Sequence, residues 1–142
     1  MKLFDTTLTR LGESLDVRLV EHNVLAANVA NADTPGYRPK ELDFAQAMAA
    51  AVQGSSAGLV ATDPHHMGAG GDATGESSRA SAAAVSLVRD GAGNSPSIDG
   101  NEVDLDRTMA GLAENSLQYG ASAKAAGKKL AILRYVVSDG AS

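Results

Sequence analysis

The chain has 142 residues and a formal net charge of −5 at neutral pH, and it contains no cysteine. A net acidic chain lacks the basic surface that replaces phosphate counterions, which argues against nucleic-acid binding, and the missing thiols exclude disulfide bonds, thiol redox chemistry and thiolate zinc sites. Aromatic residues make up only 4% of the chain and there are 15 glycines, so we expect one small domain with a thin core and much irregular chain.

The first residues, Met1 to Asp5, show neither the apolar run nor the small-residue cleavage site of a secretory signal peptide. No stretch of the sequence approaches the roughly 18 consecutive apolar residues of a membrane-spanning helix. We therefore expect a protein that is soluble or that becomes part of a larger assembly.

Residues 6–32 are predicted to form a long helix, because they contain no proline and Gly12 is their only glycine. Apolar side chains recur along this segment in two rows, which are Leu8, Leu11, Leu15, Leu19, Leu25 and Val29 in one and Val17, Val20, Val24 and Ala27 in the other. Two rows exceed what one neighbouring element covers, so we expect at least two neighbours. Pro35 disfavours helical geometry at Thr34, and Pro35 and Gly36 suit the central positions of a type II turn that ends the helix.

The middle of the chain carries weaker signals. Residues 42–52 are rich in alanine, which favours a short helix. Residues 53–97 are rich in glycine and serine and poor in large apolar side chains, so burial there offsets little of the entropy lost on ordering. We expect this segment to be mostly irregular, with a short strand at 84–89.

The C-terminal third carries the clearest pattern in the sequence. Alternating steps of four and three residues visit ten positions, nine of them apolar, which are Leu105, Met109, Leu112, Ser116, Tyr119, Ala123, Ala126, Leu130, Leu133 and Val137. A period of about 3.5 residues over this length predicts a helix about 50 Å long that packs as a coiled coil.

Charges along this helix agree with its direction. Acidic residues lie at its start, and its second half carries Lys124, Lys128, Lys129 and Arg134, as the helix dipole favours. Asp104 or Asp106 is expected to cap the start of the helix, and Gly140 to end it.

Two interpretations of the apolar rows stay open. The two long helices could form an intramolecular hairpin and need nothing else, or their rows could pack against other molecules. We favour assembly, because the rows on both helices exceed one pairwise contact. Asn28, Asn31 and Asn115 are poor helix formers: either they are exposed, or their buried amides hydrogen-bond across helices and fix the register.

Two patterns resemble parts of enzyme active sites. The segment 54–58 matches GxSxG with Ser56 as nucleophile, but the residues before it favour a helix instead of the required strand. The segment 70–77 has the spacing of a P-loop, but Glu76 stands in place of the lysine and would repel phosphate. We therefore do not expect a catalytic residue or a bound cofactor.

Metal binding has equally little support. His65 and His66 are adjacent, so in extended chain they point to opposite faces, and His22 is distant in sequence. The segment 99–104 resembles a calcium loop only weakly, because the later ligands of such a loop are missing. We expect no metal site. A serine hydrolase centred on Ser56 and a cytoplasmic helical export adaptor or chaperone stay as alternative functions.

Three segments resemble one protein family. The stretch from Asn28 to Tyr37 reads NVANADTPGY, is followed by Leu42-Asp43-Phe44, and closely resembles the N-terminal signature of flagellar basal-body rod proteins, roughly ANxANxxTPGY. A second block, 99–106, together with the residues up to Tyr119, is similar to the C-terminal region of proximal rod proteins. The segment 62–67 also resembles a short central motif of the family, which gives His66 a non-catalytic role.

This resemblance implies a mostly α-helical structural subunit whose terminal helices pair as a coiled coil around a largely irregular centre. The parts are a rod helix at 1–33, a turn and short helix at 34–52, the glycine- and serine-rich insert at 53–97, and a heptad helix at 98–142. The signature assigns an assembly role to Asn28, Asn31, Thr34, Pro35, Gly36, Tyr37, Asn101, Val103, Leu105, Glu114, Asn115 and Tyr119. The heptad pattern adds Met109, Leu112, Leu130, Leu133 and Val137.

The resemblance also implies where such a subunit works and with what. Its partners would be copies of itself, other flagellar rod proteins, the adaptor FliE at the membrane ring and the flagellar export apparatus. It would leave the cytoplasm without a cleaved signal, form part of the periplasmic rod of the basal body, line the export channel and transmit torque. No small-molecule substrate is implied.

Overall fold

The computed structural model describes residues 6–54, 74–91 and 98–138. In these residues the elements follow the order α1 (Thr6–Ala30), β1 (Lys40–Glu41), α2 (Phe44–Gly54), α3 (Thr74–Ser86), β2 (Arg89–Asp90) and α4 (Leu105–Val137). The fold is mostly helical, and its two longest helices are α1 and α4, as the sequence predicts. None of the described helices is both long enough and apolar enough to cross a membrane.

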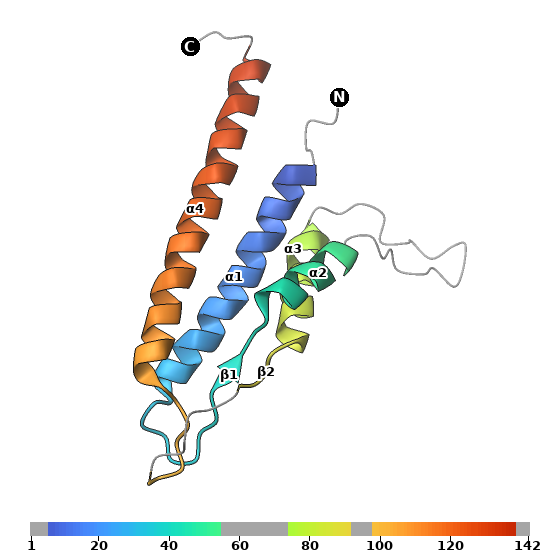
Figure 1. Ribbon diagram of the computed structural model, residues 1–142. Coiled ribbons are helices and arrows are strands. Elements are labelled where there is room, and N and C mark those ends of the chain that lie inside the picture. The colour runs from blue at the N-terminus through green and yellow to red at the C-terminus, as the bar shows by residue number, and fades with distance from the viewer. Residues whose placement is uncertain (1–5, 55–73, 92–97, 139–142) are drawn as a thin grey trace, which may run out of the picture.

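Helices α1 and α4 lie side by side and run in opposite directions (Figure 1). Because α1 has 25 residues and α4 has 33, α4 extends past the start of α1 by about 12 Å at 1.5 Å per residue. Figure 1 shows this overhang at the end of the molecule where α1 begins and α4 ends. Among the described residues, no other helix lies beside the last turns of α4.

The opposite side of α1 is covered by α2 and α3 (Figure 1). The core between them consists of two valines from α1 and four alanines, which are Val17, Val20, Ala47, Ala51, Ala80 and Ala84. Alanine permits close approach of the three helices but buries little apolar area, as the composition predicts. Helix α1 thus has the two or more neighbours that its apolar rows predict, and the alanine-rich helix predicted at 42–52 is confirmed as α2.

The centre of the chain is more ordered than expected at two places. Residues 74–86, within the segment expected to be irregular, form α3, because Ala80 and Ala84 bury against the α1 valines. The prediction of a strand at 84–89 is wrong for most of these residues, because α3 extends to Ser86. Only Arg89 and its neighbour Asp90 form β2, which pairs antiparallel with β1 through Lys40 opposite Asp90 and Glu41 opposite Arg89.

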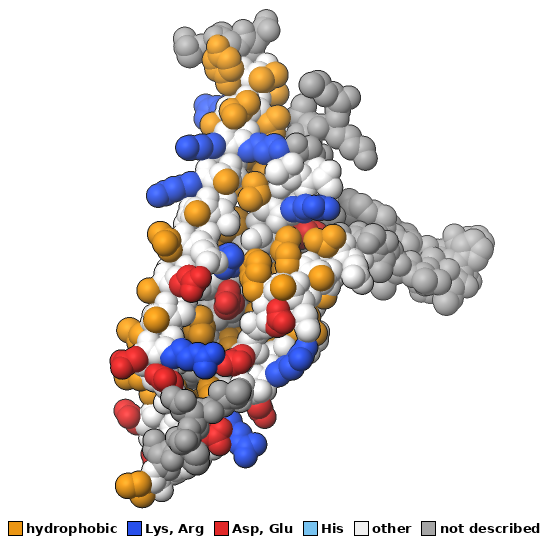
Figure 2. Space-filling view, viewed as in Figure 1, with side chains coloured by type: hydrophobic (Ala, Val, Ile, Leu, Met, Phe, Trp, Pro, Cys, Tyr) orange, Lys and Arg blue, Asp and Glu red, His pale blue; other side chains and the backbone are white. Residues whose placement is uncertain are grey.

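The predicted start of the last helix is confirmed at Asp104. Its side chain accepts a hydrogen bond from the Arg107 backbone N–H at 3.0 Å, so Asp104 and not Asp106 is the N-cap. The helix runs to Val137, and Gly140 lies outside the described residues. Figure 2 shows that carboxylates gather around the first half of α4, whereas Lys and Arg side chains gather on its second half. Ser56, His65 and His66 also lie outside the described residues.

Candidate functional site

A tight turn connects the end of α1 to the next segment. The Tyr37 backbone N–H donates to the Thr34 carbonyl at 3.2 Å, and Gly36 has φ of +70°. A positive φ at the third residue defines the predicted type II turn, and glycine adopts it without a Cβ penalty. Asn31, the first residue after α1, supports the turn, because its Oδ1 accepts from the Thr34 hydroxyl at 3.2 Å.

Asn101 attaches the segment before α4 to this turn. Its Nδ2 lies 3.0, 2.8 and 2.7 Å from the carbonyl oxygens of Asn31, Ala32 and Thr34, while its Oδ1 accepts from the Val103 backbone N–H at 2.8 Å. The Asn101 side chain is 4% exposed. One amide therefore binds three carbonyl groups of the chain that follows α1, and two of these, those of Asn31 and Thr34, also accept a backbone N–H.

Asn28 attaches the following segment in the same way. Its Oδ1 accepts from the Lys40 backbone N–H at 2.9 Å and from the Tyr37 hydroxyl at 3.2 Å, and its Nδ2 donates to the Lys40 carbonyl at 2.7 Å. This buried amide mimics a strand partner for Lys40 and so fixes where β1 begins. Asn28 is therefore buried, but its amide binds the backbone of Lys40 and the Tyr37 hydroxyl instead of another helix, so the predicted hydrogen bond across helices is not found at this residue.

Backbone hydrogen bonds complete this structure. The Gly36 N–H donates to the Asp99 carbonyl, and the Glu102 N–H donates to the Tyr37 carbonyl, both at 3.1 Å. We call Asn28, Asn31, Asn101 and the backbone that they bind the asparagine knot. The two blocks that carry the family resemblance, far apart in sequence, thus meet in one structure. Sequence reasoning missed this juxtaposition, because no pattern states which carbonyl groups an amide will reach.

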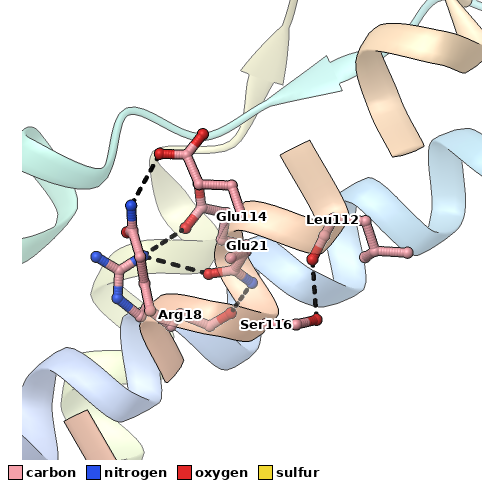
Figure 3. Close-up of polar contacts among 7 residues, drawn as sticks. Arg18, Glu21, Leu112, Glu114 and Ser116 are labelled. Atoms are coloured by element: carbon pink, nitrogen blue, oxygen red, sulfur yellow. Dashed lines mark hydrogen bonds and ion pairs between the residues drawn. The ribbon is translucent and has the colours of Figure 1, made fainter. Parts of the chain in front are cut away.

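A second polar contact joins α1 and α4 near their middle. Asn115 on α4 and Arg18 on α1 hydrogen-bond to each other, and the Arg18 guanidinium lies 4.2 Å from the centre of the Phe44 ring on α2. Figure 3 shows Arg18 and Glu21 of α1 beside Glu114 of α4. Arg18 Nη1 and Glu21 Oε2 are 3.6 Å apart. Asn115 is buried and hydrogen-bonds across two helices, as one of the two interpretations of the asparagines predicts.

Burial raises the pKa of the Glu21 carboxyl above its ordinary value; the Arg18 charge lowers this pKa and the Glu114 charge raises it. The Glu21 Oε2 and the Arg18 Nε are buried atoms with no hydrogen-bond partner in the described part of the chain. At this position along the two helices, the contact between α1 and α4 is therefore polar, and some of its buried polar atoms lack a hydrogen bond from the described residues. This limits the contribution of the contact to stability.

The face of α4 that contacts α1 is not its apolar row. Thr108 and Asn115 are the buried side chains of α4 among the described residues, and the position of a Cβ on Gly111 lies 3.7 Å from the Leu25 methyl groups. Small and polar side chains at these positions let the two helices approach closely. The heptad row lies to one side of this contact.

We call the ten heptad positions, Leu105 to Val137, the α4 seam. In the described structure Leu105 is 47% exposed, Met109 50%, Tyr119 41%, Leu130 48% and Val137 68%. Leu112, Ala123, Ala126 and Leu133 are half-buried, and the Ser116 hydroxyl donates to the Leu112 carbonyl within α4. The antiparallel helix pair therefore exists, but it leaves the larger members of the seam in contact with solvent.

The overhanging end of α4 is apolar on more than one side. Three exposed residues of this end lie outside the predicted row, which are Ile132, Tyr135 and Val136, and Leu117 is a fourth such residue nearer the middle of α4. Sequence reasoning missed them because a heptad count follows a single row. An exposed apolar surface of this kind is typical of a site of contact with other protein.

The described residues give no support to the weaker motifs. No three His, Cys, Asp or Glu side chains among them are grouped so that they could hold a metal ion. In the calcium-like segment, Asp99 accepts from the Asn101 N–H and Asp104 caps α4, so both carboxylates act structurally. Of the P-loop match, residues 74–77 begin α3, and residues 70–73 lie outside the described residues.

Comparison with known proteins agrees with the geometry. Residues 18–38 match the family described as "Flagella basal body rod protein". The flagellar basal body rod protein FlgB of Salmonella typhimurium is 33% identical over 141 residues and covers 96% of each chain, and FlgB of Escherichia coli K12 gives the same values. FlgB of Cereibacter sphaeroides ATCC 17029 is 36% identical over 107 residues, which cover 75% of this chain and 74% of the relative. These relatives are named as rod proteins, not as hydrolases or export chaperones.

Proposed function

The chain belongs to the family of flagellar basal-body rod proteins, and from this premise we propose that it is a self-assembling subunit whose terminal helices build the wall of the proximal rod. The coarse role, a structural subunit of the basal-body rod, follows from relatives named FlgB that match nearly the whole chain. The finer role concerns how the subunit assembles and what it touches.

The observation that carries this proposal is the exposure of the α4 seam. Burying a side chain such as leucine contributes about 1.5–3 kcal/mol to stability. In the single chain, however, Met109 is 50% exposed, Leu130 48% and Val137 68%. Neighbouring subunits that cover the seam and the overhanging end of α4 would supply this burial. Assembly would then be driven by apolar area that the single chain leaves unused.

The asparagine knot has a different role in this proposal. Its hydrogen bonds run within the chain, so Asn28, Asn31 and Asn101 act as positioning residues and not as subunit contacts. They fix the direction in which β1 and α4 leave the end of α1. The seam is then presented to neighbours at one angle, which a regular polymer requires.

The family resemblance supports the remaining parts of the proposal. We infer that the rod transmits torque through its packed helices, encloses the export channel and lies in the periplasm after export without a cleaved signal. Other rod proteins, the adaptor FliE and the export apparatus are the partners that this role requires.

Charge substitutions in the seam test the proposal. Leu130→Asp and Leu133→Asp should abolish rod assembly, because each places a carboxylate in an interface that must be dry. Ala125→Asp is the matched control, since Ala125 is an exposed residue of the same helix outside the seam. Purified basal bodies would be counted by electron microscopy and motility measured, with immunoblots to show equal expression. Normal motility of the Leu130→Asp and Leu133→Asp strains contradicts the proposal.

A further inference from the structure

A groove of about 420 Å³ lies between the second half of α1, β1 and the first half of α4. Its apolar surface comes from Val24, Leu25 and the backbone around Gly111, and its polar surface is dominated by carboxylates. No function described above uses this groove.

The charge of the groove is strongly unbalanced. Five carboxylates line it, which are Glu21, Glu41, Glu102, Asp104 and Glu114, against two cations. Lys40 pairs with Asp90 outside the groove, at 3.4 Å. Three of the carboxylates have an ion-pair partner, which are Glu21 with Arg18 at 3.6 Å, Glu102 with Arg38 at 3.8 Å and Glu41 with Arg107 at 3.9 Å. The groove therefore presents an apolar floor beneath negative walls, and the buried Glu21 Oε2 in it receives no hydrogen bond from the described residues.

The second half of α4 has the complementary composition. From Asn115 to Ser138 the sequence contains no acidic residue, and Lys124, Lys128 and Arg134 are exposed there beside the apolar residue Leu130. Figure 2 shows these two regions at opposite ends of the same helix. A single chain cannot bring them together, because α4 is one continuous helix from Leu105 to Val137.

We propose that this groove receives a basic amphipathic helix of an adjoining rod subunit, of the kind that the second half of α4 exemplifies. A lysine or arginine stem would lie on Val24 and Leu25, while its charged end would approach Glu102 and Glu114. A contact between two different surfaces repeats along an assembly instead of closing on itself, which is the geometry of a helical polymer. The inference rests on the proposed function and adds the chemistry of one axial contact.

The binding test uses the full-length protein and a fluorescent peptide with the sequence of residues 120–138. Saturable binding is expected, with the affinity lowered at least about tenfold by Glu114→Lys and by Glu102→Lys. Raising the ionic strength from about 0.1 M to about 1 M should also weaken binding, since it shortens the Debye length from about 10 Å to about 3 Å. Asp106→Lys is the matched control, because Asp106 is exposed on the same helix and does not line the groove.

Helical circular dichroism of each variant shows that it is folded, and the positive charge that Glu114→Lys introduces would face Glu21, which favours the fold. Absence of saturable binding to the parent chain, or equal affinity for the parent and for Glu114→Lys, overturns the inference. An equal loss of peptide affinity in the Asp106→Lys control also overturns the inference, because it shows that net charge alone causes the effect.

Assembly in cells separates this inference from the proposed function. Glu114→Lys should reduce the number of completed basal bodies, whereas Asp106→Lys should not. If Glu114→Lys cells assemble rods normally while Leu130→Asp cells do not, the groove contact is wrong and the role of the seam stands. If both assemble normally, the proposed function fails as well.

Discussion

Asn115 on α4 and Arg18 on α1 form a reciprocal pair of hydrogen bonds. The Asn115 Nδ2 donates to the Arg18 carbonyl at 2.9 Å, and the Arg18 Nη1 donates to the Asn115 Oδ1 at 3.4 Å. The same guanidinium stacks over Phe44 on α2. One arginine therefore connects three elements, and a slide of α4 along α1 would break both bonds, so the pair fixes the register of the two helices.

Glu21 lies beside this pair and gives it a pH dependence. Burial raises the pKa of the Glu21 carboxyl, against the lowering effect of Arg18 and with a further rise from Glu114. Because the folded-state pKa is raised, the stability that Glu21 contributes is fully present below its ordinary pKa of 4.5 and is lost as pH rises through the folded-state value. We expect Glu21→Gln to raise the free energy of unfolding at neutral pH, and this gain should disappear below pH 4.5.

Urea unfolding of the parent and of Glu21→Gln at several pH values measures this difference. Glu114→Gln provides the control, because removing the Glu114 charge removes one cause of the raised pKa and should shrink the gain from Glu21→Gln. A Glu21→Gln protein that is less stable than the parent at neutral pH would show that the attraction to Arg18 outweighs burial.

The asparagine knot predicts a large difference between two substitutions at one position. Asn101→Ala removes the donor to three carbonyl groups and should cost about 1–3 kcal/mol of unfolding free energy. Asn101→Asp has nearly the same shape but turns a carboxylate toward the carbonyls of Asn31, Ala32 and Thr34, so it should cost more. Urea unfolding gives both values, and Asn23→Asp at an exposed site on α1 should stay within about 0.5 kcal/mol of the parent.

Amide hydrogen exchange locates the effect of these substitutions. The Gly36 and Glu102 amides, which donate across the knot, should exchange faster in both Asn101 variants than in the parent. Unchanged exchange at these two amides, or equal stability of Asn101→Asp and the parent, would refute the role assigned to Asn101.

Two glycines should respond to alanine with opposite signs. Gly36 has φ of +70°, a conformation that costs an L-residue about 1–2 kcal/mol, so Gly36→Ala should destabilise the chain. Gly12 lies within α1 with open space around its Cβ position, so Gly12→Ala should stabilise it by about 0.5–1 kcal/mol. The unfolding temperatures of both variants would be measured against that of the parent. Two temperature shifts of the same sign would contradict the prediction.

The sequence is sufficient to predict α1, α2, α4 and the type II turn, because each depends on residues that are close in sequence. It also places the cap of α4 at Asp104 or Asp106, and the structure shows that Asp104 is the cap. Helix α3 is not predictable in this way. Its alanines become buried only because Val17 and Val20 of α1 lie opposite them, and that contact joins residues far apart in the chain. Local glycine and serine content suggests irregular chain there, and tertiary packing overrides it.

The candidate site follows the same division. The heptad period predicts which α4 residues form the seam, but it does not state that Thr108 and Asn115 would face α1 instead. A regular period identifies a face, whereas the partner of that face depends on every other surface of the molecule. Asn28, Asn31 and Asn115 were recognisable as unusual helix residues. Only the fold shows that Asn28 binds the Lys40 backbone and that Asn101 binds the Thr34 carbonyl of the turn.

The central claim is that the α4 seam is exposed in the single chain and buried in the rod. Because the chain contains no cysteine, Leu130→Cys introduces one unique thiol at the seam, and motility shows whether the variant still assembles. The rate of maleimide labelling would be measured for the monomer, for purified rods and for the same rods after denaturation. Rapid labelling of the monomer and of denatured rods, with protection of at least about tenfold in intact rods, is the predicted result. Equal labelling rates for monomer and intact rods would contradict the account.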